Sequence, residues 1–162
     1  MRLFFVTLLL AAIASNAFAS IGEVIEQVGT TTIERQAGEK LPSEEGTGVE
    51  SYDTIRTQKG KTAIQFLDDT RVDVTQNSKL VIDEFVYDPN TSTGKLALKA
   101  SFGTVRYASG QIAKNSRQNV VIKTPTAVIG VRGTDFSMTV DETGNSTVIL
   151  LPSCSGVGNT TV

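Results

Sequence analysis

Apolar and polar side chains alternate along most of the chain from residue 20 onward. The alternation is clearest in short segments bounded by Gly, Asn, Asp and Thr, at residues 24–28, 63–67, 72–74, 80–87, 96–98, 105–107, 120–122, 136–140 and 148–150. A period of two places successive side chains on opposite faces of a β-strand. No segment after residue 19 sustains the i, i+3, i+4 spacing of a helix over two turns. The pattern therefore predicts an all-β chain with almost no helix.

The connections between these segments carry turn chemistry. Residues typical of turns occupy 58–61, 67–70, 88–90, 93–94 and 141–145. Strands and turns that recur about every ten residues are typical of a β-sandwich or of a solenoid-like stack. In residues 79–87 both faces are partly apolar, which indicates a strand covered on two sides or one that carries a bulge.

Residues 34–49 differ in composition from the rest of the chain. They are polar, acidic and rich in Gly, so we expect an exposed loop. Such a loop is either a solvated connector or the first candidate for a partner contact.

The first nineteen residues have the features of a secretory signal. Arg2 is followed by an apolar run over 3–13, and the small residues Ala17 and Ala19 precede Ser20 at the positions that a signal peptidase reads. The run is too short for a membrane span, which needs roughly 20 residues. We therefore expect a signal-peptide helix over 1–19, cleavage after Ala19, and one domain over 20–162 with no transmembrane anchor. The product would be periplasmic, extracellular or at the cell surface.

The composition excludes several kinds of chemistry. The chain has 162 residues, 15 basic and 17 acidic side chains, no His and one Cys. Without His there is no Ser-His-Asp triad and no imidazole metal ligand. Cys154 cannot form an internal disulfide, so it is either a free core residue or an intermolecular link. A formal net charge of −2 gives no basic face for nucleic acid.

Acidic side chains are the remaining candidates for catalysis or metal binding. The densest group consists of Asp68, Asp69, Asp73, Asp83, Glu84 and Asp88. Glycosidases need two carboxyl groups a set distance apart, and nothing in this spacing establishes one, whereas Asp at strand ends is ordinary turn chemistry. Neither the EF-hand spacing nor a calcium-binding repeat is present. We expect no catalytic residue, no metal and no cofactor, and hence no enzyme.

The middle and C-terminal part of the chain carries a family resemblance. Residues 124–136 read TPTAVIGVRGTDF, which resembles the signature of FecR-like domains. Upstream, residues 53–57 resemble the family's early strand, and residues 103–106 resemble its Gly-x-Val-Arg step. Residues 68–70 resemble its Asp-Gly-Thr turn, with Asp69 where Gly is usual. The resemblance covers residues 49–140, and its matching positions are Asp53, Gly103, Arg106, Thr124, Pro125, Ala127, Gly130, Arg132, Gly133, Thr134 and Phe136.

Each part of this signature also has a physical interpretation. Pro125 removes a backbone donor and should end the strand that contains 120–122. Gly130 and Gly133 suggest a tight bend or bulge. Arg132 between them either donates to nearby carbonyls or to Asp135, or grips an anionic group of a partner.

The resemblance implies an all-β fold, which we expect to be a compact twisted solenoid-like stack of short strands, with a β-sandwich as the alternative. In the best-known FecR-like proteins the domain is the periplasmic part of a membrane-bound regulator that relays a signal from an outer-membrane transporter to a sigma factor. This chain resembles a free-standing exported domain without the anti-sigma and membrane-spanning parts.

The functional expectation is a noncatalytic exported binding or scaffold module at the cell envelope or surface. It would act through protein contacts made by loops or by an uncovered sheet edge. The alternatives are a calcium-dependent or carbohydrate-active surface protein, and a periplasmic signalling antenna that works with a separate membrane regulator. The protein partner and the oligomeric state stay open.

Overall fold

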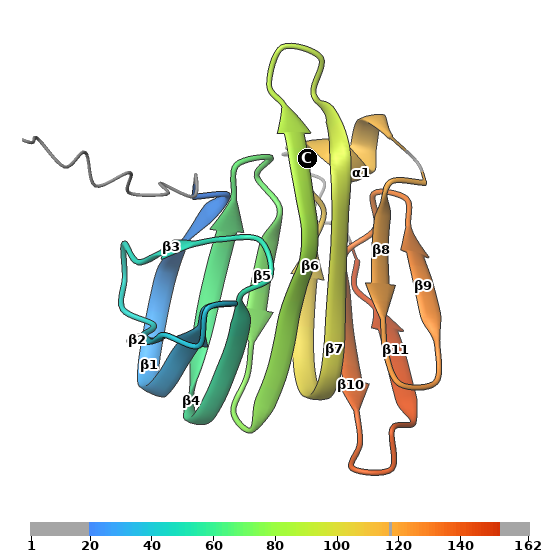
Figure 1. Ribbon diagram of the computed structural model, residues 1–162. Helices are drawn as coiled ribbons and strands as arrows, with labels where there is room; N and C mark the ends of the chain where they lie inside the picture. The colour runs from blue at the N-terminus through green and yellow to red at the C-terminus, as the bar shows by residue number, and fades with distance from the viewer. Residues whose placement is uncertain (1–19, 117, 153–162) are drawn as a thin grey trace, which may run out of the picture.

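A computed structural model describes residues 20–116 and 118–152, so the predictions for Ala17, Ala19 and Cys154 lie outside the described residues. These residues form an eleven-stranded sheet and one short helix (Figure 1). The elements are β1 (Gly22–Glu34), β2 (Lys40–Pro42), β3 (Gly48–Val49), β4 (Thr54–Phe66), β5 (Arg71–Val74), β6 (Ser78–Asp88), β7 (Thr93–Ala108), α1 (Gln111–Asn115), β8 (Val120–Lys123), β9 (Val128–Val131), β10 (Phe136–Val140) and β11 (Ser146–Leu150). The all-β prediction is confirmed. No helix in this part of the chain has the length and apolar character needed to cross a membrane.

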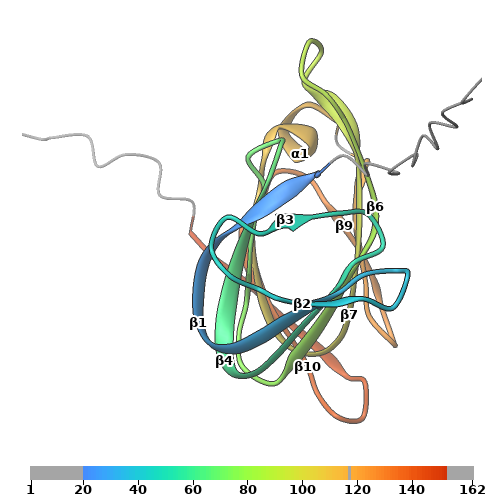
Figure 2. The same ribbon diagram turned by 60° about the vertical axis from the view of Figure 1, so that its left-hand side comes forward.

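Long strands that serve two layers organise the sheet. The first part of β4 pairs with β6 and its last part with β5, while the first part of β7 pairs with β6 and β8 and its last part with β5 and β10. The front layer in Figure 1 therefore contains β6, the first part of β7, β8 and β9, and the back layer contains β5, the last part of β7, β10 and β11. Figure 2 shows how the bent strands β1 and β4 wrap from one layer to the other.

One hydrophobic core lies between the layers. The period-two pattern explains it, because alternate residues such as Leu80 and Ile82 of β6 are fully buried while their neighbours face outward. Two aromatic pairs pack in the core, one between β4 and β6 and one between the paired strands β7 and β10. The rings of Phe66 and Phe85 stack with centroids 5.4 Å apart, and those of Tyr107 and Phe136 stack at 5.3 Å. Full burial of each such side chain contributes roughly 1.5–3 kcal/mol.

Residues 79–87, which have apolar side chains on both faces, contain a bulge, one of the two predicted alternatives. The register of β6 against β7 shifts between Ile82 and Glu84. The turns predicted at 67–70 and 141–145 are present between the strands that flank them. Residues 93–94, for which a turn was predicted, are instead the first residues of β7, and the chain reverses just before them.

The turn predicted at 58–61 is wrong, because β4 runs through these residues without a break. Gly60 lies opposite Gly29 of β1, where the β1–β4 register shifts. A side chain at Gly60 would come within 2.2 Å of the Val28 carbonyl oxygen, so the two backbones approach closely here. The glycine marks a bend that carries the pair from one layer to the other.

The segment over 34–49 is more ordered than the exposed loop that its composition predicts. It contains β2 and β3, which both pair with β1, and Ser43 and Val49 are buried. The acidic residues Glu44 and Glu45 are exposed as expected. Its short strands close one end of the sheet.

Candidate functional site

The first residues of the family signature form a tight turn between β8 and β9. The backbone N–H of Thr124 donates to the Ala127 carbonyl at 2.9 Å, and the Ala127 N–H donates to Thr124 Oγ1 at 3.0 Å. Ser146 Oγ also lies 2.7 Å from Thr124 Oγ1, and Thr126 Oγ1 donates to the Gly144 carbonyl at 2.7 Å. The turn is thereby attached to the turn between β10 and β11. Thr124 and Thr126 hold the ends of two hairpins together, and Ala127 closes the turn that contains them.

Pro125 has the effect predicted from the sequence, since β8 ends at Lys123. It also packs on the neighbouring hairpin, where a side chain at Gly144 would lie 3.1 Å from Pro125 Cβ. Further along the signature, the Thr134 carbonyl accepts a hydrogen bond from Ser109 Oγ at 3.1 Å. The Asp135 carboxylate accepts one from the Ser109 N–H at 2.8 Å. These contacts attach the β9–β10 connection to the end of β7.

Gly103 and Phe136 are required by packing. Gly103 has a φ of +91°, and a Cβ there would lie 2.0 Å from Ser78 Oγ and 2.5 Å from Ser78 Cα. Ser78 Oγ in turn accepts a hydrogen bond from the Thr104 N–H at 3.0 Å. Phe136 is 3% exposed and stacks on Tyr107. Both residues therefore have structural roles.

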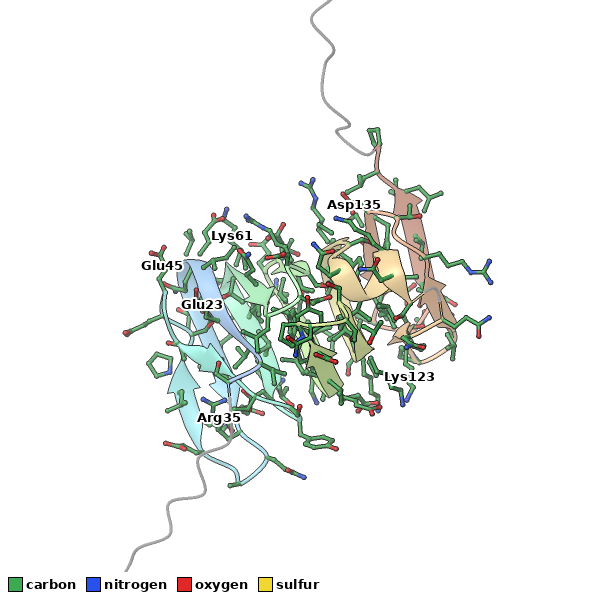
Figure 3. All side chains as sticks on the ribbon, turned by 90° about the horizontal axis from the view of Figure 1, so that it is seen from above. Glu23, Arg35, Glu45, Lys61, Lys123 and Asp135 are labelled. Carbon is green, nitrogen blue, oxygen red and sulfur yellow. The ribbon has the colours of Figure 1, made fainter. Side chains whose placement is uncertain are left out.

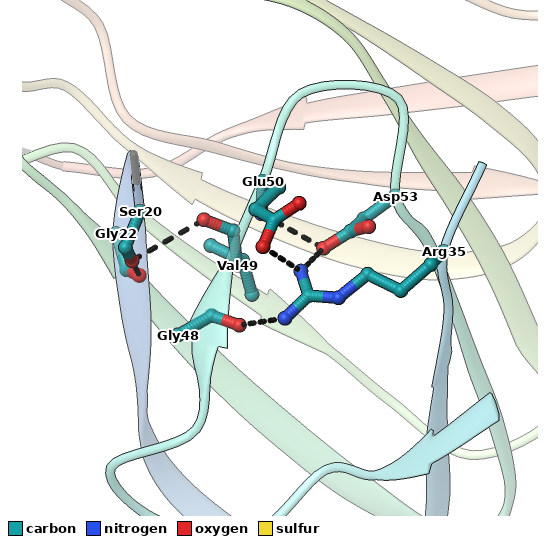
Figure 4. Close-up of polar contacts among 7 residues, drawn as sticks. All are labelled: Ser20, Gly22, Arg35, Gly48, Val49, Glu50 and Asp53. Atoms are coloured by element: carbon teal, nitrogen blue, oxygen red, sulfur yellow. Dashed lines mark hydrogen bonds and ion pairs between the residues drawn. The ribbon is translucent and has the colours of Figure 1, made fainter. Parts of the chain in front are cut away.

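Asp53, the first family position, belongs to a buried ionic cluster (Figure 4). Its side chain is 1% exposed and forms an ion pair with Arg35, which follows directly after β1. Asp53 Oδ2 also accepts a hydrogen bond from the Glu50 N–H at 2.8 Å. Arg35 donates to the Gly48 carbonyl at 3.0 Å and lies 3.4 Å from the Glu50 carboxylate. The sequence offered no sign that Arg35 is the partner of Asp53.

Burial raises the pKa of the Asp53 carboxyl, while the Glu50 N–H and the Arg35 guanidinium oppose that shift. A shallow pocket of about 330 Å³ adjoins the pair and is lined by both residues together with Glu39 and Glu50. Because the donors and charges of Arg35 are used within the cluster, its role is to close the β1, β3 and β4 end of the sheet.

Gly130 and Arg132 do not have the contacts predicted for them. Gly130 lies inside β9 with no atom within 4 Å of a Cβ built there, so the bend expected at this residue is wrong. Gly133, with a φ of +85°, marks the bend instead. Arg132 is exposed and forms no hydrogen bond or ion pair with residues 20–116 or 118–152. The turn-stapling role expected for Arg132 is therefore wrong, since Asp135 binds Ser109.

Arg106, like Arg132, is a family residue whose side chain forms no hydrogen bond or ion pair with the described residues. It lies on the outer face of the back layer, in the middle of the sheet, where it faces Asp73 of β5 and Ser137 of β10. Its side chain is exposed, and none of its donors binds a side chain or carbonyl in the described part of the chain. The guanidinium therefore has its five N–H donors available.

Charged side chains surround Arg106 and define what we call the Arg106 surface: Glu26, Lys61, Arg71, Asp73 and Arg106. Lys61 forms an ion pair with Glu26, and Arg71 lies 3.3 Å from Glu26 and 2.8 Å from Asp73. These residues line a hollow of about 310 Å³. In the view from above, Lys61 marks this outer side and Lys123 the opposite one (Figure 3).

The charges on the Arg106 surface are unequal. The hydrogen bond and charge of Lys61 lower the pKa of Glu26, and the hydrogen bond to Asp73 raises the pKa of Arg71. Glu26 is thus held ionised by Lys61, and within residues 20–116 and 118–152 Arg106 is the one cation of this surface without an ion pair. The surface is suited to a carboxylate of a partner, which Arg can bind with two parallel hydrogen bonds.

The acidic residues considered for catalysis have other partners. Asp68 is fully buried, and its carboxylate accepts hydrogen bonds from the Thr70 N–H at 3.1 Å and from the Ile112 N–H at 3.2 Å. It thereby satisfies a free donor at the start of α1 from a distant turn. The remaining members lie in exposed turns or ion pairs: Asp69, Asp73, Asp83, Glu84 and Asp88. No three acidic or Cys side chains in 20–116 and 118–152 are grouped to hold a metal ion.

Comparison with known proteins identifies one family. The family model described as FecR protein matches residues 53–152. No curated protein matches the chain, and no solved structure does. The matched range begins at the buried Asp53 and extends past β11, and it includes both exposed arginines. FecR proteins are regulatory and signalling proteins rather than known enzymes, so the match indicates a signalling-related role in protein interaction. Because the match covers more than half of the chain, this protein belongs to the FecR family.

Proposed function

We propose that this protein is a noncatalytic exported module that binds a protein partner at the cell envelope or surface, and that the Arg106 surface is its contact face. The observation that carries the proposal is the exposed Arg106. Most of the family positions are used in packing, turns or buried ion pairs, whereas Arg106 contributes nothing visible to the fold. Binding of a partner is the simplest explanation for a family residue whose donors have no partner within the described residues and whose side chain is exposed.

The charges and shape of this face favour an acidic partner segment. On the Arg106 surface three cations face two carboxylates, so an acidic segment would find an excess of positive charge beside the hollow. Arg is enriched at the energetically important positions of protein interfaces. A hydrogen bond from Arg106 to a partner carboxylate contributes about 1.5–3 kcal/mol.

Family membership favours one variant of this function, a periplasmic signalling antenna that works with a separate membrane regulator. In that case the acidic segment would belong to the regulator or to its receptor. The calcium-dependent and carbohydrate-active alternatives gain no support from the described part of the chain, whose acidic side chains are used in turns and ion pairs.

The test compares wild type with Arg106→Glu in cross-linking pull-downs from the envelope fraction of the producing cell. Lys99→Glu is the matched control, because Lys99 is exposed on the outer face of the front layer and makes the same change of charge. We expect wild type and Lys99→Glu to capture the same partner and Arg106→Glu to lose it, with unchanged circular dichroism in all three. Capture of no partner under several conditions, or equal capture by Arg106→Glu, would contradict the proposal.

A further inference from the structure

Strand β11 forms one edge of the back layer, and it lacks the features that usually protect a sheet edge. It pairs with β10 alone among the described strands. Val148, Ile149 and Leu150 are 41%, 61% and 69% exposed, and no residue of the strand is charged. The opposite end of the sheet differs, since β2 has only three residues and contains Lys40 and Pro42. Charge, proline and short length are the ordinary means of preventing edge-to-edge association.

The hydrogen-bonding pattern shows which backbone groups of β11 are free. The Leu151 N–H donates to the Asp135 carbonyl at 2.9 Å, and the Asp141 N–H donates to the Asn145 carbonyl at 3.0 Å. In an antiparallel pair the residues bonded to the neighbour alternate with residues whose N–H and C=O point the other way. The outward-pointing N–H and C=O groups of β11, which have no partner among the described residues, are therefore those of Ser146, Val148 and Leu150.

The side chains of these same residues lie on the core side of the layer. Val148 is opposite Met138 and Leu150 is opposite Phe136, and both of these β10 residues are buried. The register between β10 and β11 is continuous over all five pairs, so no bulge turns the edge away. The edge thus offers free backbone groups and apolar side chains to the same incoming strand.

We propose that β11 pairs antiparallel with β11 of a second copy of this chain, about a two-fold axis at Val148. This arrangement places Val148 opposite its own copy and Ser146 opposite Leu150. The pairs would form about six main-chain hydrogen bonds. The interface is isologous and therefore closes as a dimer.

A second copy suits this edge because the strand is complementary to itself. Its neutral side chains bring no like charges together. The acidic turn with Asp141 and Glu142 connects β10 to the start of β11. Because the two β11 strands run antiparallel, the two copies of this turn lie at opposite ends of the interface. The apolar side chains on the core side extend the two cores toward each other. A charged peptide would gain the backbone hydrogen bonds but would leave charge against Val148 and Leu150.

The dimer goes beyond the binding function proposed above, because it concerns a separate contact. A two-fold axis perpendicular to the sheet continues the back layer across both copies and keeps both outer faces on one side. Two Arg106 surfaces would therefore face the same direction. A bivalent display of this kind raises the apparent affinity for a partner that carries two sites.

The first test measures association by sedimentation equilibrium over a range of concentrations. We expect wild type to form dimers and Val148→Lys to be monomeric, because two lysines would face each other at the axis. Thr139→Lys is the control, since Thr139 is exposed on the outer face of β10 away from the edge, and it should dimerise like wild type. The proposal would be overturned if wild type stayed monomeric at every concentration, whatever occupies the edge of β11. Dimerisation of Val148→Lys would overturn it as well.

The second test checks the register with a thiol at the axis in a Cys154→Ser background. Paired residues that exchange both hydrogen bonds have Cα atoms about 5.5 Å apart, which is within reach of a disulfide. Copper–phenanthroline should therefore oxidise Val148→Cys to a covalent dimer much faster than Leu150→Cys or Thr139→Cys. Equal cross-linking of the three variants would refute the pairing. Loss of the partner by Arg106→Glu is scored separately, so the dimer and the binding function fail independently.

Discussion

Substitution of three family glycines by alanine should separate the physical reasons for which glycine is present. Gly103 has a φ of +91°, and a Cβ would meet the side chain and the backbone of Ser78. Gly133 has a φ of +85°, but the atom nearest to its Cβ is 3.7 Å away. Gly130 lies in β9 without a positive φ and has no neighbour within 4 Å. Alanine would therefore meet both backbone strain and a steric clash at Gly103, backbone strain alone at Gly133, and neither at Gly130.

The expected magnitudes follow from these differences. A left-handed backbone costs a non-glycine residue about 1–2 kcal/mol, so Gly133→Ala should lower the free energy of unfolding by about that amount. Gly103→Ala adds overpacking, which typically costs about 1–3 kcal/mol, because the backbone of Ser78 must shift. Its total loss should be about 2–5 kcal/mol. Gly130→Ala should be neutral or stabilising by up to about 1 kcal/mol, since alanine is more restricted than glycine in the unfolded chain.

Urea unfolding followed by far-ultraviolet circular dichroism measures all three variants. The midpoint should shift without a change of slope, because a change of slope would indicate an altered denatured state. Losses of similar size at Gly130 and Gly103 would refute the reasoning. So would a loss at Gly133 that matches the loss at Gly103, because the contact with Ser78 would then contribute nothing.

Two further predictions concern single side chains. Asp69 has a φ of +65° and stands where the family usually has Gly, so Asp69→Gly should raise the free energy of unfolding by up to about 1 kcal/mol, and Asp69→Val should lower it by about 1–2 kcal/mol, in the same urea assay. Burial raises the pKa of Asp53 above its usual 3.8, so the folded state holds this proton more tightly than the unfolded chain does. Relative to Asp53→Asn, wild type should therefore lose stability as the pH rises through the folded-state pKa of Asp53. Urea unfolding of both proteins between about pH 3 and 7 measures this difference. A relative loss of wild-type stability as the pH falls would contradict the prediction and would mean that the ion pair with Arg35 outweighs burial.

Strands were the most predictable part of this fold. Every segment with period-two alternation falls on an observed strand, and only Leu67, at the end of the segment 63–67, lies outside one, because alternation reflects which face of a strand is buried. The end of β8 before Pro125 was also predictable, since proline acts on its own backbone and on the residue before it. The path of the chain at 58–61 was not predictable, because Gly60 is compatible with a chain reversal and with a bent strand alike. Only the pairing with Gly29 decides between the two.

The site was less predictable than the fold. The family positions could be located from the sequence, but Arg106 and Arg132 could not be distinguished there from Asp53 or Thr124. Their roles depend on contacts between residues far apart in the chain. Arg35 is 18 positions from Asp53, and Ile112 is 44 positions from Asp68.

The sequence by itself determined the all-β class, most strand positions and the family, since local periodicity and turn chemistry are properties of neighbouring residues. The tertiary structure alone decided which family residues are buried or satisfied and which are left free. Burial and hydrogen bonding are set by strand pairing across long sequence separations. For the same reason, only the assembled sheet showed that, among residues 20–116 and 118–152, Arg106 has no bonded partner and β11 pairs with β10 alone.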